Sequence, residues 1–304
     1  MTLGVLAVTG GTGFVGSTVI RLAVEAGWQV RALARSPQAQ RAGITWVAGA
    51  LDQLTSLGAL MEGADAVLHI AGITNALSKS DFIAGNVDGT AAMLKAAEHA
   101  SVRRFIHVSS LSAREPSLSD YGWSKAQAEE LVSASGLDWT MVRPPAIYGP
   151  GDIDHLDLFK AARLGIIPLP PRGRISEIEV SDLARLLLAL PADKASIHAT
   201  YEVDDGREGG WTHEEFARAI GAAMGRTIWP LHLPAAIVRL CAKGDRLLRG
   251  SKAKLTPDRA AYFCHPNWVI DPAKRPPASL WVPHMPTLDG LQATAQAYRD
   301  AGWL

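Results

Sequence analysis

The chain has little cysteine, no excess of charge of either sign and no long apolar run. Its 304 residues include only two cysteines, Cys241 and Cys264, too few for a disulfide framework and typical of a reducing compartment. Lysine plus arginine (30) equals aspartate plus glutamate (30), so charge gives no reason to expect a nucleic-acid partner. Apolar runs such as 186–190 are far too short to cross a bilayer.

Two further absences bear on location and chemistry. A glycine-rich turn at 9–16 leaves no room for a signal peptide ahead of it, so we expect a cytoplasmic protein without a membrane span. No His, Cys or Asp cluster has the spacing of metal ligands, so we expect no metal. The length and a hydrophobic fraction of 48% suit one large domain or two fused ones.

The glycine-rich turn lies between a predicted strand at 5–8 and a predicted helix at 17–25. Glycines permit a tight turn and let a pyrophosphate approach the free amides that open a helix. The spacing fits both G-x-G-x-x-G and T-G-x-x-G-x-x-G, so we predict a dinucleotide site here. Its expected residues are Thr9, Gly10, Gly11, Thr12, Gly13, Phe14, Val15 and Gly16.

Short apolar runs alternate with helical patterns through the first half of the chain. Further strands are expected at 29–33, 45–48, 66–70, 104–108 and 140–143, and further helices at 55–61, 87–100 and 125–134. This alternation predicts an α/β protein with a Rossmann-type, doubly wound parallel sheet. Ligands of such sheets bind at the carboxyl ends of the strands.

The pattern changes after Arg143, where proline and glycine become frequent. We expect residues 1–150 to form the dinucleotide-binding Rossmann domain, with a return to it at 175–200. Residues 151–174 and 201–304 are expected to form a smaller C-terminal substrate-binding or cap region. Within it, helices are expected at 213–224 and 234–248, followed by a proline-rich irregular tail.

Tyr121 and Lys125 are four residues apart and therefore share one face of a predicted helix. A neighbouring ammonium favours the phenolate, which lets a tyrosine exchange a proton near neutral pH. Upstream, the strand at 104–108 leads into Ser109, Ser110 and Ser112, whose hydroxyls stand where ligands bind. The structural alternative is a simple helix start with turn-capping serines.

Five motifs in order make the chain resemble an extended short-chain dehydrogenase/reductase, of the NAD(P)-dependent epimerase/dehydratase superfamily and dihydroflavonol-reductase-like. Besides the glycine turn and the Tyr–Lys pair, they are N-V-D-G-T at 86–90, R-P-P-A-I-Y-G-P-G at 143–151 and V-S-D-L-A at 180–184. The resemblance implies Ser110, Tyr121 and Lys125 as catalytic residues. Further expected cofactor-binding residues are Leu51, Ala71, Gly72, Lys125, Pro144 and Ile147, the last two by resemblance only.

The end of the second predicted strand favours NADP over NAD. NAD-specific sites carry an acidic residue there for the ribose 2′-hydroxyl, whereas this chain has Ala34 followed by Arg35. A guanidinium suits a 2′-phosphate, although a solvated loop charge is the alternative, so NAD stays open. Ala50 stands where the family often has an aspartate that contacts adenine, which makes adenine recognition depend on other groups.

Weaker candidates lie elsewhere. His69 fits a core histidine, and His265 and Trp268 fit either a substrate pocket or packing of the tail. The segment 234–250 mixes apolar and basic residues, which suits a membrane surface, an apolar substrate or a cap helix packed on its own domain.

The expected function is transfer of a hydride between a nicotinamide, NADP by preference, and a small-molecule carbonyl/hydroxyl pair. Tyr121 would be the acid or base, Ser110 would orient the substrate oxygen, and Lys125 would lower the tyrosine pKa and hold the ribose. The alternatives are a nucleotide-sugar epimerase with bound NAD and, in another class, a non-catalytic NADP-binding subunit or redox sensor. Family members are often dimers, so a homodimer is an option; the substrate is not specified.

Overall fold

The computed structural model describes residues 3–250 and 253–304, which divide into two compact units. Unit 1 contains the chain up to Arg143 together with Leu183–Tyr201 and Pro276–Trp281. Unit 2 contains Pro144–Asp182, Glu202–Arg275 and Val282–Leu304.

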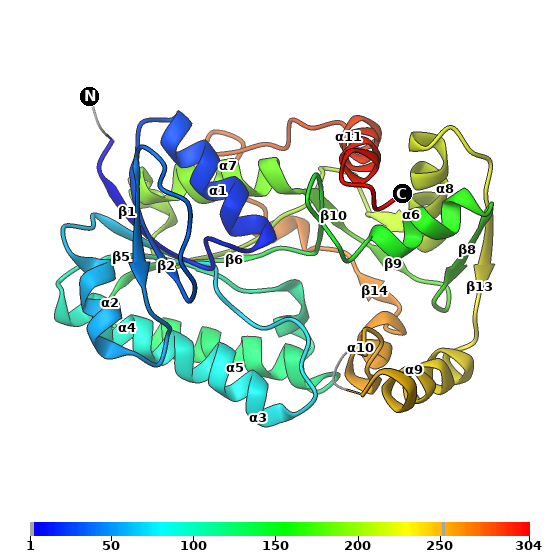
Figure 1. Ribbon diagram of the computed structural model, residues 1–304, viewed down its shortest axis with the longest axis horizontal. Helices are drawn as coiled ribbons and strands as arrows, with labels where there is room; N and C mark the ends of the chain where they lie inside the picture. Colours follow the sequence, from blue (N-terminus) through cyan, green and yellow to red (C-terminus); the bar gives the residue numbers. More distant parts are fainter. Residues whose placement is uncertain (1–2, 251–252) are drawn as a thin grey trace. The chain divides into compact units, whose positions relative to one another are not determined.

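Unit 1 is built on a seven-stranded sheet in the order β11-β6-β5-β4-β1-β2-β3 (Figure 1). The strands are β1 (Val5–Thr9), β2 (Gln29–Ala34), β3 (Ile44–Ala48), β4 (Ala66–His69), β5 (Arg104–Val108), β6 (Asp138–Arg143) and β11 (Ala199–Glu202). Every pairing from β6 to β3 is parallel. The predicted Rossmann-type α/β fold is confirmed.

Helices cover both faces of this sheet (Figure 1). They are α1 (Phe14–Glu25), α2 (Leu54–Met61), α3 (Lys79–Phe82), α4 (Gly89–His99), α5 (Asp120–Ala134) and α7 (Val180–Ala189), with short turns η1 (Ile83–Asp88), η2 (Leu111–Arg114), η3 (Leu190–Ala192) and η4 (Lys194–Ser196). Apolar side chains of α2, α4 and α5 pack on the sheet, where Leu57, Met93 and Val132 meet Val67 and Phe105 in a fully buried cluster. This core fixes the strand ends that carry the candidate site.

The strand order reverses beside β1, because β2 and β3 lie on one side of it and β4 to β6 on the other. Such a reversal opens a crevice at the carboxyl ends of the two flanking strands. Thr9 ends β1 and pairs in register with His69, which ends β4. The glycine-rich turn begins at this point.

In the residues that the structure describes, unit 2 is built of small sheets and helices. The strands are β7 (Ala146–Tyr148), β8 (Ile166–Leu169), β9 (Arg174–Ile175), β10 (Glu177–Glu179), β12 (Trp211–Thr212), β13 (Trp229–His232) and β14 (Asn267–Trp268). The helices are α6 (Leu156–Arg163), α8 (His213–Ala223), α9 (Ala235–Arg249), α10 (Pro257–Phe263) and α11 (Thr287–Asp300), with a short turn η6 (Pro272–Lys274). Tyr148, Phe159, Phe216, Leu291 and Tyr298 form the centre of its core.

The expectation of an irregular tail is wrong. The tail contains α10 and α11, and α11 runs for 14 residues. Its prolines lie ahead of the helix, with Pro286 at the N-cap. Gly290, which reads as a helix breaker, is there for packing, because a Cβ at that position would lie 3.0 Å from the Tyr148 ring. Helix α6 was not predicted either, because it lies in a proline- and glycine-rich stretch.

Candidate active site

The glycine turn carries β1 directly into α1. Gly10 adopts a φ of 72°, which favours glycine, and its carbonyl accepts a hydrogen bond of 2.9 Å from the Gly13 amide. The N-cap is Gly13, and no side chain caps the helix there. The first turn of α1 also contains no acidic residue. The amides at this helix start are therefore suited to an anionic ligand.

Close backbone packing explains why this turn needs glycine. A Cβ on Gly16 would collide with the carbonyl oxygen of Gly10 and lie 2.9 Å from the Gly11 Cα. A Cβ on Gly11 would lie 2.5 Å from the Ile20 side chain. Thr12 and Gly13 are exposed, and Phe14 and Val15 are half-buried, so the outer rim of the turn is open. The shape fits a pyrophosphate lying on bare backbone.

A buried hydrogen-bond chain ties the two strands that flank the crevice. The Thr9 hydroxyl lies 2.8 Å from Nδ1 of His69, and it accepts a bond of 3.2 Å from the Ala71 amide. Nε2 of His69 lies 3.1 Å from the Thr90 hydroxyl. Burial, and then the charge of Lys125, lowers the pKa of His69 to about 3. His69 is thus a neutral core residue, as expected, and it holds the loop that contains Ala71.

The adenosine side of the predicted site lies at the ends of β2 and β3. Ala34, the last residue of β2, is buried, and Arg35 follows it with an exposed side chain. No ion pair is recorded for Arg35 among residues 3–250 and 253–304. Leu51 follows β3 and contacts Gly89, where a Cβ would lie 2.7 Å from its Cδ1. The structure therefore presents a guanidinium, and no carboxylate, at the end of β2.

Ser110 lies at the end of β5, the strand next to β4. Its hydroxyl caps the short turn η2 by accepting the Ser112 amide at 3.2 Å, and the Ser112 hydroxyl lies 2.9 Å away. The neighbouring Ser109 hydroxyl is buried and has no hydrogen-bond partner in the part of the chain that is described. A buried hydroxyl without a partner is costly, so polar groups are available to a ligand here.

Tyr121 lies in the first turn of α5, and Lys125 lies one turn later. The Ser119 hydroxyl caps the helix by accepting the Gly122 amide at 2.9 Å. The Tyr121 ring is half-buried, and its centroid lies 6.0 Å from that of Phe82. The cap fixes the first turn of α5, and the contact with Phe82 fixes the position of the Tyr121 ring.

The Lys125 amine is buried and donates a hydrogen bond of 2.9 Å to the carbonyl of Val108, the last residue of β5. A Cβ on Gly72 would lie 3.1 Å from the Asn86 amide oxygen and 3.7 Å from the Lys125 Nζ, so Gly72 lies beside the amine. Burial lowers the pKa of Lys125 from 10.5 to about 8, against an opposing effect of the Glu129 carboxylate. Glu129 is itself held by Arg143 at 2.6 Å. The amine therefore stays mainly protonated at neutral pH.

The structure thus brings Ser110, Lys125 and Gly72 to the carboxyl ends of β4 and β5, with the glycine turn at the end of β1. The two remaining predicted residues, Pro144 and Ile147, lie in unit 2. Pro144 is buried, and Ile147 pairs with Ile178 across β7 and β10.

The profile of the NAD(P)H-binding family matches residues 10–193, from the glycine turn past the Tyr–Lys pair. The chain is an extended short-chain dehydrogenase/reductase. The resemblance inferred from the motifs is confirmed.

Relatives of this dehydrogenase/reductase match it over nearly its whole length. Ceramide reductase of Caulobacter vibrioides (strain NA1000 / CB15N) is 36% identical over 312 residues, 99% of this chain and 96% of the relative. UDP-glucose 4-epimerase of Vibrio cholerae is 24% identical over 327 residues, 96% of this chain and 95% of the relative. The Bordetella bronchiseptica enzyme WbmH, solved in complex with NAD+, shares the fold, with a TM-score of 0.77, 19% identity and coverage of 98% of this chain and 99% of that one. The chain is an NAD(P)-dependent enzyme of the oxidoreductase/epimerase type.

Asn86 is a residue of this dehydrogenase/reductase that sequence reasoning left without a role. Its Nδ2 donates to the Ser124 hydroxyl at 2.8 Å, and its amide group bonds both backbone groups of Ile73, at 2.7 and 3.0 Å. Asn86 thus joins the loop after β4 to the turn of α5 between Tyr121 and Lys125. It lies in the π-helical turn η1, and such turns are frequent at functional sites. The N-V-D-G-T motif was the signal that could have assigned it.

Other polar clusters of the dehydrogenase/reductase are structural. Asp182 of the V-S-D-L-A motif accepts the backbone amides of His284 and Met285, both at 2.9 Å. Trp268 is buried and stacks on Tyr262, with ring centroids 4.5 Å apart. In residues 3–250 and 253–304 no group of three or more His, Cys, Asp or Glu side chains could hold a metal ion.

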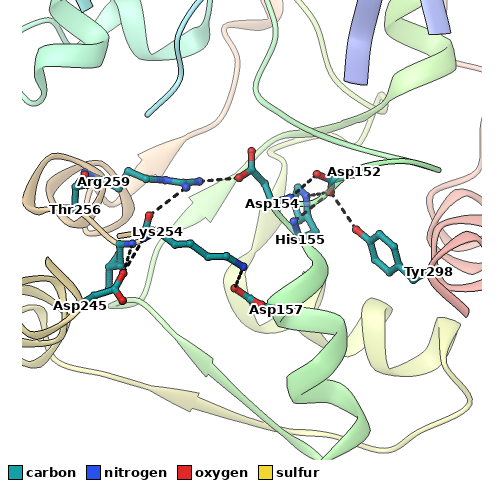
Figure 2. Close-up of polar contacts among 10 residues, drawn as sticks. Asp152, Asp154, His155, Asp157, Asp245, Lys254, Thr256, Arg259 and Tyr298 are labelled. Carbon is teal, nitrogen blue, oxygen red and sulfur yellow. Dashed lines mark hydrogen bonds and ion pairs between the residues drawn. The ribbon is translucent and has the colours of Figure 1, made fainter. Parts of the chain in front are cut away.

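A buried charged cluster lies in the core of unit 2 (Figure 2). His155 bonds Asp152 at 2.6 Å through Nδ1 and approaches Glu177 at 3.4 Å through Nε2. The Tyr298 hydroxyl donates to Asp152 at 3.4 Å. Burial lowers the pKa of His155, but the carboxylates of Glu177 and Asp152 outweigh it and raise that pKa well above its usual value. The imidazolium therefore lies between two buried carboxylates, offsets one of their two negative charges and holds β10 to the start of α6.

Proposed function

We propose that this enzyme is an NADP-dependent reductase of a ketone on a ceramide-class lipid. The observation that carries the proposal is the buried Lys125 amine, one helical turn after Tyr121 and bonded to the carbonyl that ends β5 just before the serines. An ammonium at this position can lower the pKa of the Tyr121 phenol and donate a hydrogen bond to a ribose hydroxyl. The whole-length similarity to ceramide reductase supports the substrate class.

Ser110, Tyr121 and Lys125 have separate roles in the proposed reaction. When bound, the reduced nicotinamide supplies the hydride that adds to the ketone carbon. Ser110 donates a hydrogen bond to the ketone oxygen, on which negative charge develops. Tyr121 donates its proton to that oxygen, which leaves a phenolate and an alcohol product. The Lys125 charge stabilises the phenolate, and solvent reprotonates it.

Binding of the dinucleotide is assigned to the chain's own backbone and one guanidinium. The amides of the glycine turn would hold the pyrophosphate, and Lys125 would hold the nicotinamide ribose. Arg35 would pair with the 2′-phosphate of NADP, and Ala34 leaves no carboxylate to repel it. Residues 151–174 and 201–304 would supply substrate contacts.

Consumption of NADPH tests this function. The purified enzyme is given NADPH or NADH together with a ketone-bearing ceramide-class lipid in detergent micelles, and the comparison is the same lipid with a hydroxyl in place of the ketone. We expect oxidation of NADPH that depends on the lipid ketone, slower oxidation of NADH and no oxidation of either with the hydroxyl lipid. Equal use of both nucleotides would contradict the assigned role of Arg35, and no turnover of the lipid ketone would contradict the substrate class.

A second candidate is a nucleotide-sugar epimerase, favoured by the match to UDP-glucose 4-epimerase across 96% of this chain. An epimerase oxidises and then re-reduces one carbon. It needs to retain its nucleotide, because the nucleotide reduced in the first step supplies the hydride for the second. The nucleotide released on denaturing the purified protein distinguishes the two: retained NAD with conversion of UDP-glucose to its 4-epimer indicates epimerase. A non-catalytic subunit or redox sensor would bind NADP and turn over neither substrate.

A further inference from the structure

Helix α9 (Ala235–Arg249) lies beside α10 in unit 2 (Figure 1), and the burial and polarity of its side chains divide it into three faces. At about 3.6 residues per turn, residues spaced by three, four or seven positions share a face. Val238 and Ala242, four apart, are buried against α10, where they meet Ala260. The other two faces of α9 are exposed.

Polar contacts fix the inner side of α9 to the rest of unit 2 (Figure 2). Asp245 accepts the backbone amides of Lys254 and Leu255 at 2.8 and 2.9 Å. The Lys254 amine bonds Asp157 of α6 at 3.0 Å, and Arg259 of α10 bonds Asp154 at 3.2 Å. The Asp245 contacts hold the same side of α9 that buries Val238 and Ala242, and the opposite side of the helix is exposed.

The first exposed face is apolar. Ile237, Leu240, Leu247 and Leu248 are 44%, 68%, 87% and 86% exposed. They follow the spacing i, i+3, i+10, i+11 and therefore form one stripe. Isolated exposed leucines are common on protein surfaces, but four large apolar side chains aligned on one helix indicate an interaction surface.

The second exposed face is basic. Arg239, Lys243 and Arg246 follow the spacing i, i+4, i+7 and are all exposed. Their ammonium and guanidinium groups have no recorded ion pair within residues 3–250 and 253–304. With Arg249 and the single acid Asp245, α9 carries four positive charges and one negative, a net +3, in a chain whose net charge is +0. The surplus of positive charge is concentrated beside the apolar stripe.

We propose that α9 docks on the surface of an anionic lipid bilayer. Its apolar stripe would enter the boundary between headgroups and acyl chains, while the basic stripe beside it would lie among anionic headgroups. A 15-residue helix is about 22 Å long and can lie in the interface plane without spanning the membrane. Within residues 3–250 and 253–304 no helix is long and apolar enough to span one.

Charge complementarity selects a bilayer over a second copy of the chain. In a symmetric contact through α9, the same face of each copy meets its equivalent, which brings two net +3 helices together. An anionic bilayer offers both the apolar interior and the opposite charge. The proposal rests on α9 alone and does not require the proposed lipid substrate, although docking would place the enzyme where such a lipid resides.

Vesicle flotation tests the proposal with the full-length enzyme. Vesicles of phosphatidylcholine alone are compared with vesicles that contain one-third phosphatidylglycerol, across a range of salt. We expect binding to the anionic vesicles that weakens with salt. Replacing Arg239, Lys243 and Arg246 by Gln should weaken it roughly 10²-fold, and the double variant Leu240→Ser/Leu247→Ser should weaken it by a similar factor.

Matched controls carry the same changes elsewhere. Arg21→Gln/Lys95→Gln/Arg299→Gln removes the same charge from α1, α4 and α11, and Leu54→Ser/Leu288→Ser replaces leucines that are 70% and 44% exposed. Both controls should bind vesicles as the wild type does. Turnover of a water-soluble ketone without vesicles should be equal in all variants, so loss of docking is distinguished from loss of hydride transfer.

Three results would overturn the proposal. They are absence of vesicle binding by the wild type, equal losses in the α9 variants and the controls, and a wild-type dimer that the leucine variants abolish without any vesicle binding. The last result would assign the apolar stripe to a second copy of the chain.

Discussion

Replacing Lys125 by Met should slow catalysis strongly without destabilising the protein. The amine is fully buried, and its pKa falls from 10.5 to about 8 because burial disfavours the charged form. At about 1.4 kcal/mol per pH unit, holding that charge at pH 7 costs the folded protein roughly 3 kcal/mol. Methionine has a similar length and no charge, so the variant escapes this cost.

The opposing effect is the loss of one hydrogen bond. Lys125 donates to the Val108 carbonyl at 2.9 Å, and leaving that buried acceptor unpaired costs about 1–3 kcal/mol. The net result at pH 7 is an unfolding free energy that is unchanged or raised by up to about 2 kcal/mol. Under the proposed mechanism, turnover should fall by about 10²–10⁴-fold, because Tyr121 would lose the charge that lowers its pKa.

The same reasoning fixes the sign of a pH dependence. Between pH 8 and 10.5 the unfolded lysine binds a proton that the folded lysine has released, so the stability of the wild type rises with pH. Its unfolding free energy should gain up to about 3 kcal/mol relative to Lys125→Met over that range. Urea denaturation of both proteins from pH 7 to 10.5 measures this difference. A variant that is more than 2 kcal/mol less stable at pH 7, with a pH dependence parallel to the wild type, would refute the argument.

Three further perturbations test other parts of the molecule. Gly16→Ala should raise the Kd for the dinucleotide about tenfold or more, because the added methyl group collides with the Gly10 carbonyl. A Cβ at Gly58 meets nothing within 4 Å, so Gly58→Ala should leave that Kd unchanged. Isothermal titration measures both Kd values. Arg35→Ala should raise the Kd for NADPH roughly tenfold and leave the Kd for NADH unchanged in the same titration. An equal rise in both Kd values would contradict recognition of the 2′-phosphate by Arg35. The unfolding free energy of His155→Gln should fall furthest below that of the wild type below pH 6.5. Because the pKa of His155 is raised in the folded protein, its stabilising effect is lost as pH rises, and the difference should shrink by up to about 1.4 kcal/mol per pH unit above pH 6.5. A difference in unfolding free energy that does not change with pH would contradict this.

Local patterns were sufficient to predict strands β1 to β6 of unit 1, but they did not predict the edge strand β11 (Ala199–Glu202). The parallel strands of unit 1 are short β-branched runs bounded by turns, and the glycine spacing at 10–16 reflects contacts within the turn itself, such as Gly16 against Gly10. Structure that depends on residues close together in the chain can therefore be predicted from the sequence. The same holds for Ala34 and Arg35, which lie in consecutive positions at the end of β2.

Unit 2 and the support of the site depend on contacts between distant residues. Strand β9 has two residues and pairs with β12 and β14, which lie far along the chain, so no local pattern predicts it. The close approach of Gly290 in α11 to the Tyr148 ring joins positions more than 140 residues apart, which no local pattern shows. Likewise, the sequence places Lys125 on a helix but does not show that its amine meets the Val108 carbonyl or that Asn86 bonds Ser124.

The most direct test of hydride transfer assisted by a tyrosine proton is the rate of Tyr121→Phe measured beside its affinity for NADPH. The change removes one hydroxyl and keeps the ring that contacts Phe82. We predict a Kd for NADPH within about twofold of the wild type, and single-turnover reduction of the lipid ketone slower by about 10²–10⁴-fold. Reduction at the wild-type rate with unchanged NADPH affinity would contradict the account.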